Sequence, residues 1–279
     1  RWQRTYEPIT DQWIGASSVF DALVSMATFR LNEDKAEEAT VVGDNEVSYK
    51  ARSIYHPFLG EKAVRNNFDI QNHEYYIITG ANMAGKSTFL RTLGVNYILA
   101  MNGLPVFAEE MRVSVFRLFT NMRTTDDLTH GISYFNAELL RLKQLIASLD
   151  PNVPSLIILD EILKGTNSLD KLNGSRLFLE YISERNVTGV IATHDLELSK
   201  LEDENPQRFH NYSFEIELGT DVTYTYKIGR GVARNQNATF LLKQILIWRF
   251  PNWHLLSVYN ANINSKKHQE TANSNMQVR

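Results

Sequence analysis

An eight-residue stretch from Gly80 to Ser87 has the residue types and the spacing of a phosphate-binding loop. It reads Gly-Ala-Asn-Met-Ala-Gly-Lys-Ser and fits the pattern G-x-x-x-x-G-K-[ST], with an apolar run before it and a helical pattern after it. Glycines let backbone N–H groups turn toward phosphate oxygens, and the start of the following helix adds the positive end of its dipole. Lys86 would reach the β- and γ-phosphates and the Ser87 hydroxyl would bind Mg²⁺, so the stretch predicts a nucleoside triphosphate site.

Two carboxylates follow a second apolar run. The segment Ser155 to Leu159 has the pattern of a buried strand, and Asp160 and Glu161 come directly after it. Ligands of α/β sheets bind at the carboxyl ends of the strands. We therefore expect Asp160 to hold Mg²⁺ and its water shell, and Glu161 to position or deprotonate the attacking water.

A histidine stands at the end of the next apolar run, Thr188 to Thr193. In a doubly wound sheet this order places His194 at the same edge as the phosphate loop. A neutral imidazole there could sense the γ-phosphate or the attacking water. The alternative is a histidine that only precedes a helix capped by Asp195.

The elements that must position these residues alternate between strand and helix from Tyr75 onward, which predicts a mostly parallel sheet flanked by helices. A hairpin is expected after it, with strands Tyr212–Leu218 and Thr223–Ile228 joined by a glycine turn. The other expected strands are Val47–Ile54, Tyr75–Thr79, Arg112–Phe119, Ser155–Leu159 and Thr188–Thr193. The expected helices are residues 16–32, Ser87–Ala100, Asn136–Leu149, Leu169–Arg185 and Asn237–Ile247.

The composition is that of an ordinary globular protein, with 43% hydrophobic and 22% charged residues among 279. The absence of cysteine excludes disulfides and thiolate metal sites and fits a reducing compartment. A formal net charge of −3 gives no overall basic signal for nucleic acid. We expect no signal peptide and no membrane segment, and therefore a cytoplasmic location; because the chain begins at Arg1, we also expect it to be a C-terminal piece of a longer protein.

Taken together, the motifs resemble the ATPase domain of the MutS family of DNA mismatch repair proteins. The Asn82-Met83 pair inside the phosphate loop is the most specific mark, because it is unusual among P-loop proteins. The other carriers of the resemblance are Asp126-Asp127-Leu128 with Ser133 and Glu138 behind it, Leu159-Asp160-Glu161 leading to Gly165-Thr166-Asn167, Ala192-Thr193-His194 followed by Glu197-Leu198, and upstream His56-Pro57 and Asp21-Ala22-Leu23.

The resemblance implies a P-loop NTPase fold of the ATP-binding-cassette type, with an antiparallel β subdomain beside the mostly parallel sheet. It also implies ATP hydrolysis with Mg²⁺. The family commonly stacks an aromatic ring on adenine; Ala63 stands at that position here, and Tyr226 is the candidate substitute. The remaining nucleotide contacts carried over from the family's loop are Gly80, Asn82, Met83, Ala84, Gly85, Lys86, Ser87 and Thr88.

The same resemblance implies a homodimer with two composite sites. Ser133 of each subunit would close the Lys86 loop of the other, with Asn167 and Asp170 near the interface. Hydrolysis through Glu161 would then release an ATP-held clamp. Double-stranded DNA, bound by upstream domains, and other mismatch repair proteins would be the partners. The implied division is residues 1–40 as the end of a lever-helix region, 41–247 as the ATPase domain, and 248–279 as a divergent, flexible tail.

Some positions depart from the family pattern. Ala81 and Ala84 replace a proline and a glycine, Leu163-Lys164 replaces Gly-Arg, and the signature loop differs around Ser133. The family's dimerising helix–turn–helix is not recognisable in Trp248 to Arg279. Two other functions stay open: a nucleotide-gated dimerisation module without a repair role, and a transporter-type cassette. The latter would need a Leu-Ser-Gly-Gly-Gln signature and a glutamine after the second strand, and neither is evident.

Overall fold

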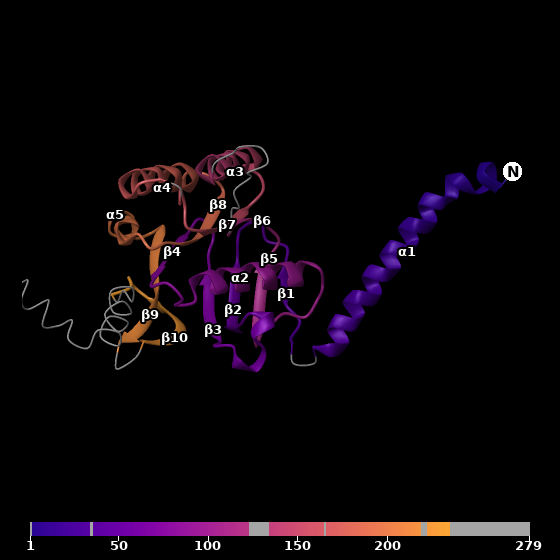
Figure 1. Ribbon diagram of the computed structural model, residues 1–279, viewed down its shortest axis with the longest axis horizontal. Coiled ribbons are helices and arrows are strands. Elements are labelled where there is room, and N and C mark those ends of the chain that lie inside the picture. The colour runs from indigo at the N-terminus through magenta and orange to yellow at the C-terminus, as the bar shows by residue number, and fades with distance from the viewer. Residues whose placement is uncertain (1, 34–35, 123–133, 165, 219–221, 235–279) are drawn as a thin grey trace, which may run out of the picture.

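The protein is described here by a computed structural model covering residues 2–33, 36–122, 134–164, 166–218 and 222–234, in which two β-sheets and their helices form a body from which one long helix projects (Figure 1). The helices are α1 (Trp2–Asn32), α2 (Lys86–Met101), α3 (Tyr134–Ser148), α4 (Ser168–Ser183) and α5 (Leu201–Glu204), with 3₁₀ turns at Pro57–Lys62 and Leu196–Lys200. The strands are β1 (Thr40–Val42), β2 (Tyr49–Ile54), β3 (Asn66–Ile70), β4 (Tyr75–Gly80), β5 (Glu110–Ser114), β6 (Arg117–Asn121), β7 (Ser155–Asp160), β8 (Val187–Ala192), β9 (Phe209–Leu218) and β10 (Val222–Arg230).

The larger sheet has the strand order β10-β9-β4-β8-β7-β6. Five of these strands run parallel, and β10 pairs antiparallel with β9, which confirms the predicted parallel sheet and hairpin. All six residues of β4, of β7 and of β8 are buried, as expected for apolar runs in the middle of a sheet covered on both faces. Their carboxyl ends therefore meet at one edge, where the phosphate loop begins.

The smaller sheet has the order β1-β5-β2-β3 and is mixed, because β1 pairs parallel with β5. The prediction of one strand from Arg112 to Phe119 is wrong: β5 lies in this sheet and β6 in the larger one. Between them Phe116 stacks on Tyr97 with ring centroids 4.0 Å apart, and the Tyr97 hydroxyl donates to the Phe116 carbonyl. This anchor lies where the chain passes from one sheet to the other, and the alternation of buried and exposed residues breaks there, since Val113 and Ser114 are both buried.

Two apolar cores lie on opposite faces of the larger sheet. One is filled around α2, between the sheets, and includes Ile78, Leu90 and Tyr49. The other lies under α3 and α4 and includes Ile77 and Leu145. Alternate residues of β4 thus enter different cores. The core around α2 fixes the helix that must receive phosphate at its first turn.

Helix α1 is longer than the predicted helix 16–32 and ends before the polar break that begins at Glu33. Most of its apolar side chains are exposed, and Phe29 contacts Phe107 where the helix meets the body. Within α1, Ile9–Asn32 is long and apolar enough to cross a membrane by length and composition, with a mean hydropathy of 1.2, so the expectation of no membrane segment stays a prediction. Core helices of soluble proteins share that length and composition, so this property alone does not define a membrane span.

Several predicted features lie outside the described residues. They include the helix Asn237–Ile247, the tail 248–279, the turn Gly219–Asp221 and the signature segment with Asp126, Asp127 and Ser133.

Candidate nucleotide site

The phosphate loop joins β4 to α2 through three backbone positions with positive φ. Gly80 ends the strand at φ 150°, and a Cβ there would lie 2.8 Å from the carbonyl oxygen of Phe214. Met83 has φ 66°, and Gly85 has φ 112° as the residue that precedes α2. No side chain caps this helix start, so the first amides of α2 are available to an anion.

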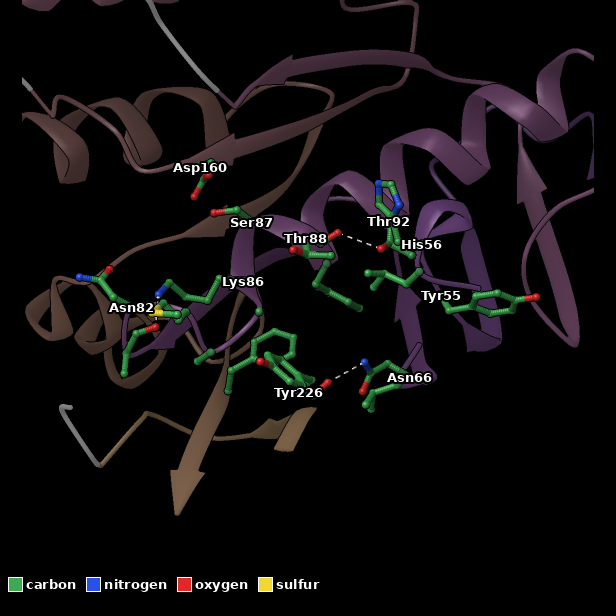
Figure 2. A pocket seen from close by; sticks show the side chains of 18 of the residues that line it. Tyr55, His56, Asn66, Asn82, Lys86, Ser87, Thr88, Thr92, Asp160 and Tyr226 are labelled. Atoms are coloured by element: carbon green, nitrogen blue, oxygen red, sulfur yellow. Dashed lines mark hydrogen bonds between the residues drawn. The ribbon is translucent and has the colours of Figure 1, made fainter. Parts of the chain in front are cut away.

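A cavity of about 700 Å³ opens above the loop, which is within the usual range for small-molecule sites (Figure 2). The loop lines it from Ala81 to Thr88. The structure brings to the same cavity four further residues that the sequence singled out: Asp160, Glu161, His194 and Tyr226. Gly80 does not line the cavity, but its carbonyl oxygen accepts a hydrogen bond from Lys86.

Lys86 is the buried cation at the base of the cavity, with only 6% of its surface exposed. Its Nζ donates to the carbonyl oxygens of Gly80 at 2.6 Å and Ala81 at 2.9 Å. Burial lowers the pKa of Lys86 to about 8, against the opposing effects of Glu161 and Asp160. An ammonium held in this way by backbone oxygens is poised to gain a phosphate as its partner.

Ser87 and Asp160 supply two oxygens that suit a hard divalent cation. Their side chains point toward each other across the cavity, one from the start of α2 and one from the end of β7 (Figure 2). Among the described residues, no group of three or more His, Cys, Asp or Glu gathers as a metal site. A Mg²⁺ ion here would take its remaining ligands from phosphate and water, as Mg²⁺ in nucleotide sites generally does.

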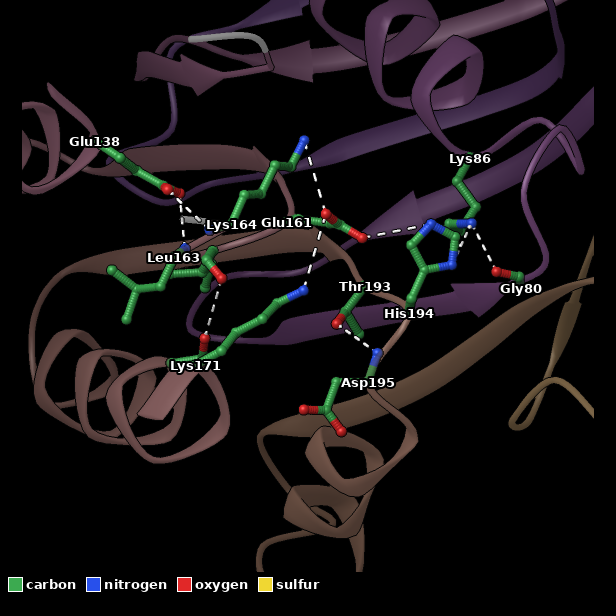
Figure 3. A network of polar contacts seen from close by, with 12 residues as sticks. Gly80, Lys86, Glu138, Glu161, Leu163, Lys164, Lys171, Thr193, His194 and Asp195 are labelled. Carbon is green, nitrogen blue, oxygen red and sulfur yellow. Dashed lines mark hydrogen bonds and ion pairs between the residues drawn. The ribbon is translucent and has the colours of Figure 1, made fainter. Parts of the chain in front are cut away.

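Glu161 occupies a left-handed backbone conformation, φ 62°, and its amide donates to the carbonyl of Ala192 at 2.9 Å. Its Oε2 lies 3.9 Å from Nζ of Lys164 and 3.8 Å from Nζ of Lys171 (Figure 3). Its Oε1 lies 3.4 Å from Nε2 of His194. The carboxylate is therefore surrounded by nitrogen groups at the edge of the cavity.

His194 bridges the lysine and the carboxylate. Its Nδ1 is 3.4 Å from Nζ of Lys86 and its Nε2 faces Glu161. Burial, and then the charge of Lys86, lower the pKa of His194 below its ordinary value of 6.5, so the ring is neutral at pH 7. Because an ammonium can only donate, the tautomer that suits both neighbours carries its proton on Nε2. Asp195 caps the following 3₁₀ turn by accepting from the Glu197 amide. His194 therefore both precedes a capped turn and lines the cavity.

The cavity is also lined by residues that the sequence analysis did not select, among them Lys62, Val64 and Asn66. His56, which the family resemblance singled out, lines it as well, and Tyr226 is 44% exposed and has φ 53°. Asn66 holds the Tyr226 backbone, donating to its carbonyl at 3.1 Å and accepting from the amide two residues on at 3.0 Å. No local pattern marks Asn66, because its partners are far away in the sequence.

Asn167 and Asp170 lie at the start of α4 and do not line the cavity. Asn167 caps the helix by accepting from the Asp170 amide at 3.0 Å, and its amide group donates to the Asp170 carboxylate at 2.6 Å. Both side chains are exposed. Ser133, predicted to act across a dimer interface, is outside the described residues.

An α/β domain with a strand–loop–helix phosphate site and carboxylates at the end of a neighbouring parallel strand belongs to the P-loop ATPase class. Residues 76–246 match the sequence family described as MutS domain V, which covers more than half of the chain. The chain belongs to the MutS family.

The chain is similar to proteins called DNA mismatch repair protein MutS in several bacteria. It is 31% identical to that of Caldicellulosiruptor bescii over 223 residues, covering 76% of this chain and 25% of the relative. It is 31% identical to that of Clostridium botulinum (strain Loch Maree) over 245 residues, which cover 84% of this chain and 25% of the relative. It is 32% identical to that of Acetivibrio thermocellus over 203 residues, which cover 70% of this chain and 23% of the relative. The chain thus spans about a quarter of the length of these relatives.

Proposed function

We propose that this chain is the ATP-binding and ATP-hydrolysing module of a MutS-like DNA mismatch repair protein, with a P-loop fold of the ATP-binding-cassette type. The observation that carries the proposal is the convergence of Lys86, Ser87, Asp160, Glu161 and His194 on one cavity at the end of three parallel strands. The relatives' names, DNA mismatch repair protein MutS, add the repair context.

The residues have separate roles in this proposal. The amides at the start of α2 and the Lys86 ammonium bind the β- and γ-phosphates. Ser87 and Asp160 would hold Mg²⁺, which would supply positive charge to neutralise the phosphates. Glu161 positions the attacking water and accepts its proton, and the neutral His194 orients the carboxylate and the γ-phosphate oxygens. Tyr226 offers its ring to the adenine.

The active form in this proposal is a homodimer with two composite sites. Two exposed residues, Asn167 and Asp170, stand at the start of α4, outside the subunit's own cavity, where a partner could be met. Ser133 would complete the partner's site. Double-stranded DNA would be bound through upstream domains. Helix α1 would form the end of the lever that transmits the nucleotide state to them. Other mismatch repair proteins would bind the ATP-bound form in the cytoplasm.

The test compares two variants of the full chain. Glu161→Ala should bind ATP with wild-type affinity, hydrolyse it at least ~100-fold more slowly, and accumulate as an ATP-bound dimer on size exclusion. Lys86→Ala should lose ATP binding because it removes the buried ammonium. Undiminished affinity in Lys86→Ala would refute the phosphate site, and undiminished hydrolysis in Glu161→Ala would refute the catalytic assignment. A wild-type chain that binds ATP without turnover would favour the nucleotide-gated dimerisation module instead.

A further inference from the structure

A buried carboxylate lies behind the proposed catalytic residue. Glu138, on α3, has only 1% of its surface exposed and does not line the nucleotide cavity. A carboxylate removed from water must find strong hydrogen-bond donors. Its Oε1 accepts from the amide of Leu163 at 2.7 Å, and its Oε2 accepts from the amide of Lys164 at 2.9 Å (Figure 3).

Those two amides belong to the turn that carries Glu161. Within this turn Glu161 and Leu163 both have left-handed backbones, with φ of 62° and 58°. Residues with side chains adopt this conformation only where the surrounding structure compels it.

Helix α4 holds the turn from the other side. The Leu163 side chain is buried against Gly174, where an added Cβ would lie only 2.5 Å from its Cδ1. The hydroxyl of Ser175 also approaches the carbonyl of Ile162, at 3.5 Å. These contacts fix the side-chain face of the turn, whereas Glu138 fixes its amide face. Glu138 contacts that amide face through both of its carboxylate oxygens.

We propose that Glu138 is a positioning residue, which holds the strained turn after β7 and thereby points the Glu161 carboxylate toward the cavity. The inference rests on the proposed function, because it treats Glu161 as the group that acts on water. Glu138 touches neither the cavity nor the reacting atoms. It acts through the backbone of Leu163 and Lys164, and its loss would leave one buried and one partly buried amide without their acceptor while the turn relaxes.

The first test measures hydrolysis by Glu138→Gln in the full chain. The carboxamide has nearly the same shape, but it can accept from only one amide and presents N–H₂ to the other. We expect kcat to fall about tenfold or more while the Kd for ATP changes less than about threefold, since the phosphate contacts come from a different loop. Glu138→Asp keeps both oxygens on a shorter side chain and should restore part of the lost kcat.

The second test needs no nucleotide. Amide hydrogen exchange in the peptide containing Leu163 and Lys164 should be about tenfold faster in Glu138→Gln than in the wild type. Asn211→Ala is the matched control: it removes a buried side chain on β9 that donates to the Ser199 carbonyl at 2.8 Å, away from this turn. This variant should lose stability and keep both kcat and the slow exchange of the turn.

The outcomes separate the inference from the proposed function. Unchanged exchange and kcat in Glu138→Gln would overturn the positioning role, and so would an equal loss of kcat in Asn211→Ala. If the wild-type chain neither binds nor hydrolyses ATP, the proposed function fails. Faster exchange confined to the Glu138→Gln turn would then still establish that Glu138 braces it.

Discussion

Nucleotide binding should weaken above neutral pH because of Lys86. Burial lowers the pKa of this lysine from 10.5 to about 8 in the protein without nucleotide. Phosphate oxygens beside the ammonium favour its charged form, so binding should return the pKa toward its ordinary value. The protonated lysine is therefore the form that binds ATP, and the affinity should fall as the pH rises through about 8.

The size of the effect follows from the fraction of charged lysine. With a pKa of about 8, roughly three-quarters of Lys86 is charged at about pH 7.5 and roughly 3% at about pH 9.5. The Kd for ATP should rise roughly 25-fold across that interval, a loss of about 2 kcal/mol. The lowered pKa also acts on folding: the unfolded chain binds this proton more tightly, so the stability of the nucleotide-free protein should rise between about pH 8 and 10.5.

Isothermal titration in buffers of different ionisation enthalpy tests the proton directly. At about pH 8 the protein should take up about half a proton for each nucleotide bound. Lys86→Arg is the control, because its guanidinium does not titrate in this range and should give a constant proton balance. The pKa of His194 lies below 6.5, outside the window. A Kd that is constant from pH 7.5 to 9.5, or an equal pH dependence in Lys86→Arg, would refute the reasoning.

Two further substitutions probe the ends of the cavity. Tyr226→Ala should raise the Kd for ATP about tenfold and leave the Kd for inorganic triphosphate unchanged, because stacking on a base contributes roughly 1–3 kcal/mol. The control Tyr226→Phe keeps the ring and should bind ATP like the wild type. An equal loss of affinity for triphosphate in Tyr226→Ala would exclude base stacking. Lys171→Met removes an ammonium 3.8 Å from Glu161 and should weaken ATP binding about fivefold at low salt. Lys171→Arg keeps the charge and should bind ATP like the wild type in the same titration. A wild-type Kd in Lys171→Met would show that this charge does not act on the phosphates.

The parts of the fold that the sequence could predict are those with local signals. The apolar runs of β4, β7 and β8 are confirmed as strands, because a strand buried on both faces needs apolar residues at every position. The glycines of the phosphate loop mark positive φ at Gly80 and Gly85, which no other residue type adopts as readily. The roles assigned to the residues that line the cavity stay predictions.

The remaining features depend on packing between distant segments. The left-handed backbone at Leu163 could not be predicted, because the residue there is not a glycine. The side chain that accepts from its amide, Glu138, lies 25 residues earlier, on α3. Asn66 holds Tyr226 across 160 residues of sequence. The division between β5 and β6 falls beside Phe116, whose ring and backbone are held by Tyr97, 19 residues earlier in the chain. In each case a tertiary contact decides the local structure.

The charges around the cavity also indicate which form of nucleotide the site should prefer. Four ammonium groups, on Lys62, Lys86, Lys164 and Lys171, line or adjoin the cavity with two carboxylates, on Asp160 and Glu161, while His194 is neutral. A free triphosphate would place its full negative charge beside both carboxylates. The Mg²⁺ complex carries less charge and brings a cation to the oxygens of Ser87 and Asp160, so like-charge repulsion falls where it is greatest. The site is therefore matched to the Mg²⁺ complex of ATP. Chelation of Mg²⁺ should weaken ATP binding more than the loss of either Lys164 or Lys171.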